Sequence, residues 1–327
     1  MRALLCKEYG LPESLVLEDV PPLSASAGHV VVRVHACGVN FPDTLIIQGQ
    51  YQFKPALPFA PGAEVAGVIS AVGAGVTQFN VGDRVIAFVG WGGFADEVVA
   101  EASRIIPMPA DLDFPTAAAF VLTYGTSYHA LQDRARLQAG ETLLVLGAAG
   151  GVGLAAVELG KLLGARVIAS ASSDEKLAVC SQYGADELIN YSHDDLRERI
   201  KTLTAGRGVD VVYDPVGGAL TEAALRSTAW GGRLLVVGFA SGDIPRIPLN
   251  LTLLKGCSIV GVFWGEFTVR EPKRNAQELA QLMTWLHEGR LKPHISATYP
   301  LERAADALHA IGQRTVVGKA VVVMTQE

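Results

Sequence analysis

A glycine-rich segment near the middle of the sequence has the residue types that bind a phosphate group. Residues 143–153 read Leu-Leu-Val-Leu-Gly-Ala-Ala-Gly-Gly-Val-Gly, an apolar run that leads into glycines and then into the apolar spacing of a helix. Glycines let the backbone approach a pyrophosphate closely, and the N–H groups at a helix N-terminus attract an anion. The spacing of Gly147, Gly150 and Gly153 departs from GxGxxG, so the bare pattern is weak. Its position between a strand and a helix predicts a dinucleotide site, with a ligand-free tight turn as the alternative.

The residues after the next expected strand predict which dinucleotide is bound. A chain that binds NAD usually has an acidic residue there, about 20 residues beyond the glycines, to bond the ribose. Here residues 170–173 read Ser-Ala-Ser-Ser, and Asp174 stands in what reads as a capping box for the following helix. Lys176 offers a point charge for a 2′-phosphate, although a solvated surface lysine is the alternative reading. The pattern favours NADPH.

The composition excludes several classes of function. The chain of 327 residues has a formal charge of −6 and no long run of Lys or Arg, which argues against nucleic acid and anionic lipid as partners. No apolar run reaches membrane-spanning length, and charged residues interrupt the N-terminus before a signal-peptide core could form. The 4 cysteines are far apart and form no CxxC pair. These features predict a cytoplasmic protein with reduced thiols.

The order of the expected elements predicts two domains. Up to about Ala102 the sequence reads as short strands separated by Gly, Pro and Asp, which suggests a small barrel or sandwich. A helical pattern begins at Thr116 and runs through Leu131, so we place a boundary near residue 118. Strand patterns over 142–146, 165–169, 209–213 and 234–237 then alternate with helical patterns over 152–163 and 176–183. This alternation indicates an α/β domain with a doubly wound parallel sheet. Later strands are expected over 258–262, 294–299 and 319–324, and a helix over 275–287.

Several short motifs resemble those of the zinc-independent NADPH:quinone oxidoreductases, a branch of the medium-chain dehydrogenase/reductase superfamily. The resemblance covers nearly the whole chain. It rests on the glycine loop, Gly-Val-Asn-Phe-Pro-Asp at 38–43, Pro-Gly-Ala-Glu-Val-Ala-Gly at 61–67, Leu-Thr-Tyr-Gly-Thr at 122–126, Ile-Asn-Tyr at 189–191 and Asp-Pro-Val-Gly-Gly at 214–218.

This resemblance implies a domain organisation and an assembly. A GroES-like, β-rich catalytic domain would occupy residues 1–118, and a Rossmann NADPH-binding domain would occupy 119–265. The C-terminal segment, 266–327, would return to the catalytic domain. The resemblance also implies a homodimer, in which the strand near Val260 extends a sheet across two copies.

The resemblance bears on metal binding as well. Family members that use a catalytic zinc have a Cys at the position of Asn40 and a His at the position of Ala63, and neither ligand is present here. A catalytic zinc needs about three protein ligands, and a structural zinc needs four, commonly clustered cysteines. The sequence has no such cluster, and Glu64 is expected to be a turn or hydrogen-bonding residue. We therefore expect no metal.

Candidate site residues also follow from the resemblance. Asn40 and Thr123 would lie beside the nicotinamide, and the catalytic set would be Asn40, Asp43, Tyr51 and Thr123. The cofactor-binding residues would be Asn40, Thr123, Ala149, Gly150, Gly151, Val152, Gly153, Ser172, Lys176, Tyr191, Gly238, Phe239, Phe263, Trp264 and Arg314. Some members have a tyrosine where Leu45 stands, which leaves the substrate contacts open. The alternative reading is that Asn40 and Asp43 fix a loop and that the aromatic residues pack in the core.

The expected chemistry is hydride transfer. A nicotinamide cofactor carries the hydride, so the protein chiefly orients the reactants and keeps the pocket dry. Asn40 could donate a hydrogen bond to a developing oxyanion or to the carboxamide of the ring. We expect reduction of a quinone, with reduction of an activated C=C bond in an enal, an enone or an acryloyl-CoA-type thioester as the alternative. A non-catalytic NADPH-binding protein and a zinc alcohol dehydrogenase are the remaining hypotheses.

Overall fold

The computed structural model describes residues 1–325, which form two compact units. Unit 1 consists of Met1–Leu122 together with the segment from Pro293 onward, and unit 2 is Thr123–Lys292. The C-terminal return therefore begins at Pro293, whereas the family resemblance implied that all of 266–327 returns to the catalytic domain. The first boundary lies at Leu122, close to the expected position near residue 118.

Helix α10 (Pro272–His287) explains why the chain returns to unit 1 only at Pro293, since this helix belongs to unit 2. Its apolar stripe of Leu279, Leu282 and Leu286 is buried, and the ring of Trp285 contacts Tyr128 edge-on within unit 2, with ring centroids 5.7 Å apart. A helical period shows that one face of α10 must be covered, but it does not show which surface covers it. The sequence alone therefore could not assign this helix to unit 2.

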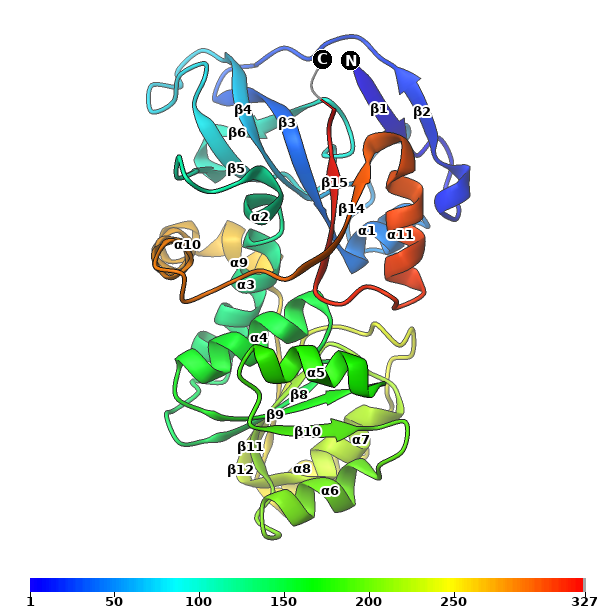
Figure 1. Cartoon of the computed structure of the whole chain (residues 1–327), viewed down its shortest axis with the longest axis vertical. Helices are drawn as coiled ribbons and strands as arrows, with labels where there is room; N and C mark the ends of the chain where they lie inside the picture. The colour runs from blue at the N-terminus through cyan, green and yellow to red at the C-terminus, as the bar shows by residue number, and fades with distance from the viewer. Residues whose placement is uncertain (326–327) are drawn as a thin grey trace. The chain divides into compact units, whose positions relative to one another are not determined.

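Unit 1 contains a seven-stranded sheet that the two ends of the chain build together. Its strand order is β14-β15-β3-β4-β5-β7, with β6 paired to β3, and β1 and β2 form a separate pair. The strands are β1 (Arg2–Leu5), β2 (Val16–Asp19), β3 (His29–Val39), β4 (Glu64–Val72), β5 (Arg84–Phe88), β6 (Glu97–Glu101), β7 (Ile105–Pro107), β14 (Ile295–Pro300) and β15 (Lys319–Val323). Figure 1 shows β15 alongside β3, and their antiparallel register sets Ala320 opposite Val39. This pairing brings Lys319 close to Asn40.

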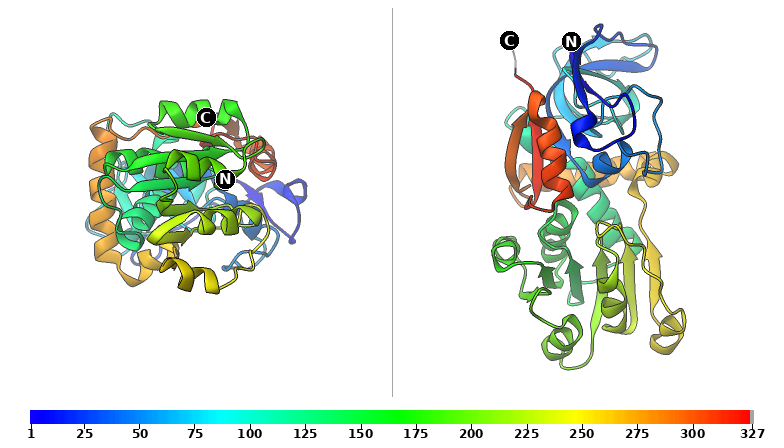
Figure 2. Two further views of the ribbon diagram at one scale, coloured as in Figure 1. Left: turned by 90° about the horizontal axis from the view of Figure 1, so that it is seen from below. Right: turned by 90° about the vertical axis from the view of Figure 1, so that its right-hand side faces the viewer.

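The helices of unit 1 cover parts of this sheet. They are α1 (Phe41–Ile46), α2 (Phe114–Ala118) and α11 (Ala304–Gly312). Helix α11 lies beside β14 and β15 (Figure 2) and buries Ala304, Ala307 and Leu308. These side chains join the fully buried valines of β3 and β15 in one apolar core. Burial of this apolar surface is the main force that holds the C-terminal segment on unit 1.

The helix expected from Thr116 through Leu131 is interrupted. Helix α2 ends at Ala118, where the N–H of Ala119 donates to the carbonyl oxygens of Pro115 and Thr116 and tightens the last turn. A new helix, α3 (Val121–Tyr128), then leads into a π-helical turn over His129–Arg134. An apolar helical period continues across such a break, so the pattern could not reveal it.

Unit 2 is a parallel sheet in Rossmann order. The strand order is β10-β9-β8-β11-β12-β13. The chain adds β9 and β10 on one side of β8, then crosses over and adds β11, β12 and β13 on the other side. The strands are β8 (Thr142–Leu146), β9 (Arg166–Ala171), β10 (Glu187–Asn190), β11 (Val209–Asp214), β12 (Thr228–Val236) and β13 (Ser258–Gly261). In such a sheet a ligand binds outside the carboxyl ends of the strands where the order reverses. Here that point lies between β8 and β11.

Crossover helices cover both faces of this sheet (Figure 1). They are α4 (Gly151–Leu162), α5 (Asp174–Gln182), α6 (Leu196–Leu203), α7 (Ala219–Arg226) and α8 (Asn250–Lys255). Helix α9 (Trp264–Arg270) comes after the last strand of the sheet and is not a crossover. Right-handed connections set α4 and α5 on one face and α6 and α7 on the other. Helix α4 packs closely on β8, since a Cβ at Gly160 would lie 2.7 Å from Cδ2 of Leu143. Within residues 1–325, no helix is both long and apolar enough to span a bilayer.

Candidate functional site

The glycine loop between β8 and α4 is too tightly packed to accept side chains at two of its glycines. A Cβ at Gly153 would lie 2.3 Å from the carbonyl oxygen of Gly147. Gly147 itself has a φ of 57°, and a Cβ there would lie 2.8 Å from Cγ2 of Val216. Gly150 is the N-cap of α4, so the first N–H groups of the helix point out of its end without partners inside the helix. This backbone is well suited to hold a pyrophosphate.

Strands β9 and β10 bring together the residues expected at a 2′-phosphate. The parallel register pairs Ala171 with Asn190, so Ser172 and Tyr191 follow neighbouring strands. The Nζ of Lys176 donates to Oγ of Ser172 over 3.1 Å. All three side chains are half-buried, and together they offer one ammonium and two hydroxyls. Groups of this kind bind phosphate oxygens through charge-assisted hydrogen bonds.

The nearby carboxylates, Asp174 and Glu175, already have hydrogen-bond partners in the protein. Ser173 is the N-cap residue, and its Oγ accepts the N–H of Lys176, which confirms the expected cap. Oδ1 of Asp174 accepts a hydrogen bond of 2.7 Å from Nδ2 of Asn190. A hydrogen bond to Ser173 lowers the pKa of Glu175. Asp174 therefore already has a partner that competes with a cofactor ribose.

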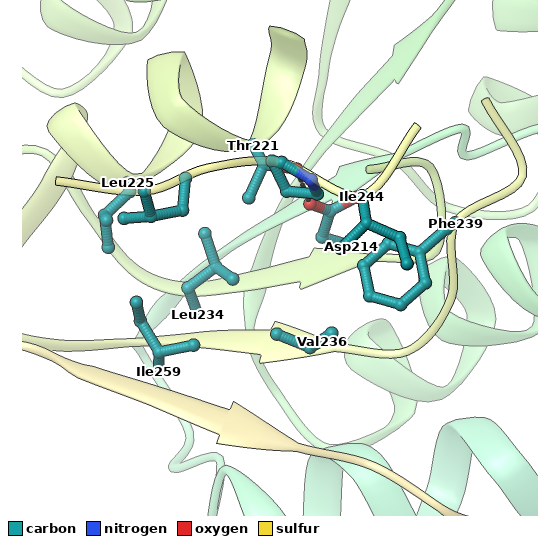
Figure 3. Close-up of a pocket in the computed structure, with 10 residues that line it drawn as sticks. Asp214, Thr221, Leu225, Leu234, Val236, Phe239, Ile244 and Ile259 are labelled. Atoms are coloured by element: carbon teal, nitrogen blue, oxygen red, sulfur yellow. Dashed lines mark hydrogen bonds between the residues drawn. The ribbon is translucent and has the colours of Figure 1, made fainter. Parts of the chain in front are cut away.

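The loops after β11 and β12 meet at the same edge of the sheet and cover an apolar pocket of about 170 Å³. Figure 3 shows Phe239 and Ile244 from the second loop close to Asp214, the last residue of β11. Oδ2 of Asp214 accepts from Oγ1 of Thr221 over 2.6 Å, and Oδ1 accepts the N–H groups of Val216 and Gly217. The polar lining is thus satisfied internally. The pocket suits an apolar group, and the anionic part of a cofactor fits the glycine loop instead.

Other expected cofactor residues lie in different surroundings. The indole of Trp264 is buried, its Nε1 donates to Oδ1 of Asn275 over 3.1 Å, and a Cβ at Gly125 would lie 2.7 Å from the ring. The side chain of Trp264 therefore serves packing inside unit 2. Phe263 is 45% exposed, and Arg314 is an exposed residue of unit 1 with a φ of 57°.

A second group of expected residues forms a buried polar cluster in unit 1. The carboxylate of Glu64 is fully buried, and its Oε1 accepts from Nδ2 of Asn40 over 3.0 Å and from Nζ of Lys319 over 2.7 Å. Its Oε2 accepts the N–H of Leu122 over 2.9 Å. Lys319 is 4% exposed and also donates to Oδ1 of Asn40 over 2.6 Å. The hydrogen-bonding role expected for Glu64 is confirmed, and Lys319 is a member that the sequence analysis missed.

This cluster fixes the orientation of the Asn40 amide. Because Lys319 can only donate, Oδ1 must face it, and Nδ2 then donates to Glu64 and to the carbonyl oxygen of Gly38. Both N–H groups of the amide are therefore used inside the protein. The expected donation from Asn40 to an oxyanion is therefore not available in this arrangement.

The same cluster does not fit a catalytic zinc. The family's zinc ligands would stand at Asn40 and Ala63, but Oδ1 of Asn40 already accepts from an ammonium and Ala63 has no donor atom. The ammonium of Lys319 also contacts Glu64, the neighbouring carboxylate. A divalent cation beside a buried ammonium would face direct repulsion. The donor set thus lacks the ligands that zinc requires.

Asp43 lies next to this cluster at the first turn of α1. Its Oδ2 accepts the N–H of Asn40 over 2.8 Å, and its Oδ1 accepts the N–H of Gly62 over 3.2 Å. Burial raises the pKa of Asp43 to about 7, against the lowering effects of these N–H groups and of Lys319. Burial, followed by the charge of Asp43, also raises the pKa of Tyr51. Asp43 thus anchors two loop segments and titrates near neutral pH.

The titration of Asp43 should make stability depend on pH. The folded protein keeps the proton of Asp43 up to about pH 7, whereas an unfolded chain loses it near pH 4. Between these values the folded state binds more protons, so the free energy of unfolding should fall as pH rises, by up to about 1.4 kcal/mol per pH unit, and level off above pH 7. In urea titrations from pH 4.5 to 8, Asp43→Asn should flatten this slope and the exposed control Asp19→Asn should not. An unchanged slope in Asp43→Asn would contradict the assignment.

One further cluster has metal-ligating atoms. Among residues 1–325, His129, Asp133 and Glu278 place three such atoms within 4.8 Å of one another. The guanidinium of Arg274 already forms ion pairs with both Asp133 and Glu278. Burial, and next the contact with Asp133, raises the pKa of Glu278 to about 8. Arg274 therefore takes the place that a cation would need.

Two family models match the chain. The model described as "Alcohol dehydrogenase GroES-like domain" matches residues 26–110, within unit 1. The model described as "Zinc-binding dehydrogenase" matches residues 151–286, within unit 2. The two models therefore match parts of the two units in the order that the resemblance implied.

Whole-chain comparisons agree with these models. Quinone oxidoreductase-like protein 2 of Bos taurus is 42% identical over 97% of this chain and 91% of its own length. The crystal structure of Escherichia coli quinone oxidoreductase complexed with NADPH is 29% identical, covers 99% of this chain and 100% of its own, and has a TM-score of 0.93. The CurK enoyl reductase structure is 29% identical, covers 99% and 98%, and has a TM-score of 0.89. The chain therefore belongs to the quinone oxidoreductase branch of the medium-chain dehydrogenase/reductase superfamily, and it is an oxidoreductase.

Proposed function

We propose that this protein is a zinc-free, NADPH-dependent reductase that transfers a hydride to a quinone. The observation that carries the proposal is the group formed by Ser172, Lys176 and Tyr191, which offers an ammonium and hydroxyls where an NAD-binding chain has a carboxylate. The NADPH in the related Escherichia coli structure supports the same cofactor here. The Lys319 ammonium beside Asn40 supports the zinc-free part of the proposal.

NADPH would supply the hydride, and the chain would hold and orient it. The glycine loop would bind the pyrophosphate, and the Ser172 group would bind the 2′-phosphate. Following the family resemblance, we assign Asn40 and Thr123 to the nicotinamide. Asn40, whose amide is held in one orientation by Lys319 and Glu64, would help to orient the ring. Hydride transfer to a quinone gives a hydroquinone anion, which takes one proton from water, so the chain needs no strong acid for this reaction.

Reduction of an activated C=C bond is the second candidate. The structural likeness to the CurK enoyl reductase favours it. This reaction adds a hydride to one carbon and a proton to the other, so it needs a proton donor. Tyr51 is the candidate donor, because a tyrosine hydroxyl carries its proton at neutral pH and the negative charge of Asp43 acts on it.

A panel of acceptors separates the two candidates. NADPH oxidation would be followed at 340 nm (a standard assay wavelength) with 1,4-naphthoquinone, an enal and an acryloyl-CoA-type thioester. We expect kcat/KM for the quinone to exceed the other two by about tenfold or more, a difference of about 1.4 kcal/mol in transition-state binding. Tyr51→Phe should leave quinone turnover within about twofold. Turnover of the thioester without the quinone would assign the C=C reaction instead.

We also propose that the protein is a homodimer joined along β13. This strand is last in the order of the unit 2 sheet, and an edge strand is where a strand of another chain can add to a sheet. Large apolar side chains are exposed on the nearby segments, with Trp230 at 81%, Leu249 at 75% and Leu253 at 79%. A second copy that pairs along the same edge would cover them. Sedimentation velocity should show a mass of two chains, and a single-chain mass at micromolar concentration would contradict the proposal.

A further inference from the structure

We infer that Glu158 is a positioning residue, which ties both connections between the two units to the helix that follows the glycine loop. The chain passes between the units at Leu122–Thr123 and again at Lys292–Pro293. Oε2 of Glu158 accepts from the hydroxyl of Tyr124 over 2.7 Å, one residue after the first passage. Oε1 accepts the backbone N–H of Lys292 over 3.0 Å, at the second passage. One carboxylate thus binds the ends of both connections, and we call these two hydrogen bonds the Glu158 tether.

Helix α4, which carries Glu158, is packed tightly on the sheet of unit 2. Glu158 lies on α4, whose residues 153–157 and 159–160 are buried against the sheet. Since a Cβ at Gly160 would collide with Leu143, the helix cannot move closer to β8 or turn there without losing contact. The same helix begins at the glycine loop. Any group fixed to Glu158 is therefore fixed relative to the proposed pyrophosphate site.

The two segments that bond to Glu158, at Tyr124 and at Lys292, are held in place by buried neighbours. Tyr124 is 3% exposed, and the next residue, Gly125, lies directly against the Trp264 ring. Leu291, which precedes Lys292, is 1% exposed. Burial raises the pKa of Glu158, whose neighbouring titratable groups are Tyr124, Tyr183 and Lys292. Burial removes water from the carboxylate, so its hydrogen bonds to the Tyr124 hydroxyl and the Lys292 N–H are stronger than they would be in water.

This tether has a consequence for hydride transfer, and here the inference rests on the proposed function. Thr123, assigned to the nicotinamide, precedes Tyr124. Loss of the tether would leave the glycine loop and the 2′-phosphate group intact but would free Thr123 to shift relative to them. A misplacement of about 1 Å can lower a rate by about a hundredfold without weakening binding. Loss of Glu158 should therefore lower kcat and leave the KM for NADPH nearly unchanged.

Hydrogen exchange tests the tether without any catalytic assay. In NADPH-bound protein, Glu158→Ala should speed exchange at the Lys292 amide at least tenfold. The Leu291 amide, which bonds to the carbonyl oxygen of Trp285, should keep its protection. Ser127→Ala is a matched control. It removes another bond between α3 and α4, from Oγ of Ser127 to the carbonyl oxygen of Val152, together with the bond between Ser127 and the Tyr213 hydroxyl, and it leaves Glu158 in place. Unchanged exchange at Lys292 in Glu158→Ala would overturn the tether.

Kinetics tests the positioning role. Glu158→Ala should lower kcat about tenfold or more with the KM for NADPH within twofold. Glu158→Gln should restore most of kcat, because an amide oxygen still accepts the Lys292 N–H and its N–H can donate to the Tyr124 hydroxyl oxygen. If kcat stays within twofold of wild type while exchange at Lys292 rises, the positioning role is wrong. If wild-type protein fails to oxidise NADPH with any of the acceptors in the panel, the proposed function is wrong. The exchange result alone then decides whether the tether exists.

Discussion

Replacement of Lys319 with Met should lower the free energy of unfolding by about 3–5 kcal/mol. The Nζ of Lys319 contacts Glu64 at 2.7 Å and Asn40 at 2.6 Å, and both charged side chains are at most 5% exposed. Removal of the ammonium would leave the Glu64 carboxylate buried without a counter-charge. Such a group must be protonated or bring water into the core, and either change costs several kcal/mol. Urea unfolding monitored by circular dichroism measures the loss.

Two controls isolate the cause of this loss. Lys7→Met removes an exposed ion pair of the same unit, in which Lys7 and Glu18 are 48% and 36% exposed, and should cost at most about 1 kcal/mol. The double variant Glu64→Gln with Lys319→Met removes both charges and should recover at least half of the loss, since an uncharged pair has no stranded carboxylate. A cost below about 1 kcal/mol for Lys319→Met would show that the cluster does not depend on the ammonium.

Replacement of Lys176 with Ala should weaken NADPH binding by about 10–100-fold. Hydrogen bonds to charged groups contribute about 1.5–3 kcal/mol, and each 1.4 kcal/mol is a factor of ten in Kd. Lys176 donates to Ser172, so its ammonium already points at the hydroxyl that would share the 2′-phosphate. NADH has no 2′-phosphate, and its affinity should change by less than about twofold. Calorimetric titration of both cofactors measures the difference.

The matched control is Lys201→Ala. Lys201 lies on α6 of the same unit, and its side chain is 70% exposed in a loose contact of 3.9 Å with Glu198. It should leave the affinity for both cofactors unchanged, which would exclude a general effect of net charge. Equal losses for NADPH and NADH in Lys176→Ala would place the 2′-phosphate elsewhere.

Local patterns were sufficient to predict much of unit 2. The strand Thr142–Leu146 was expected with the bounds that the structure has, because a continuous apolar run ends at a glycine loop. Strand β12 begins at Thr228, earlier than the expected Leu234, since Trp230 and two glycines interrupt the apolar pattern. The short strand β10 was expected only as a motif. Its few residues show too little alternation to be recognised.

The site was predictable where its residues are close in the sequence. Ser172 and Lys176 are four positions apart where β9 leads into α5, so local structure alone brings them together. Asn40 and Lys319 are separated by 279 positions, and only the pairing of β15 with β3 brings them together. The one available signal was a lysine at the start of an otherwise apolar strand. Glu158 escaped notice for the same reason, because its two partners lie on distant segments.

A crystal structure with NADPH and 1,4-naphthoquinone, collected with an absorption scan at the zinc edge, tests the central claim most directly. We expect the pyrophosphate at residues 147–153, the 2′-phosphate within hydrogen-bond distance of Lys176 and Ser172, the quinone against the nicotinamide, and no zinc signal. A 2′-phosphate away from Lys176, or a zinc ion bound near Glu64, would contradict the claim that this is a zinc-free NADPH reductase.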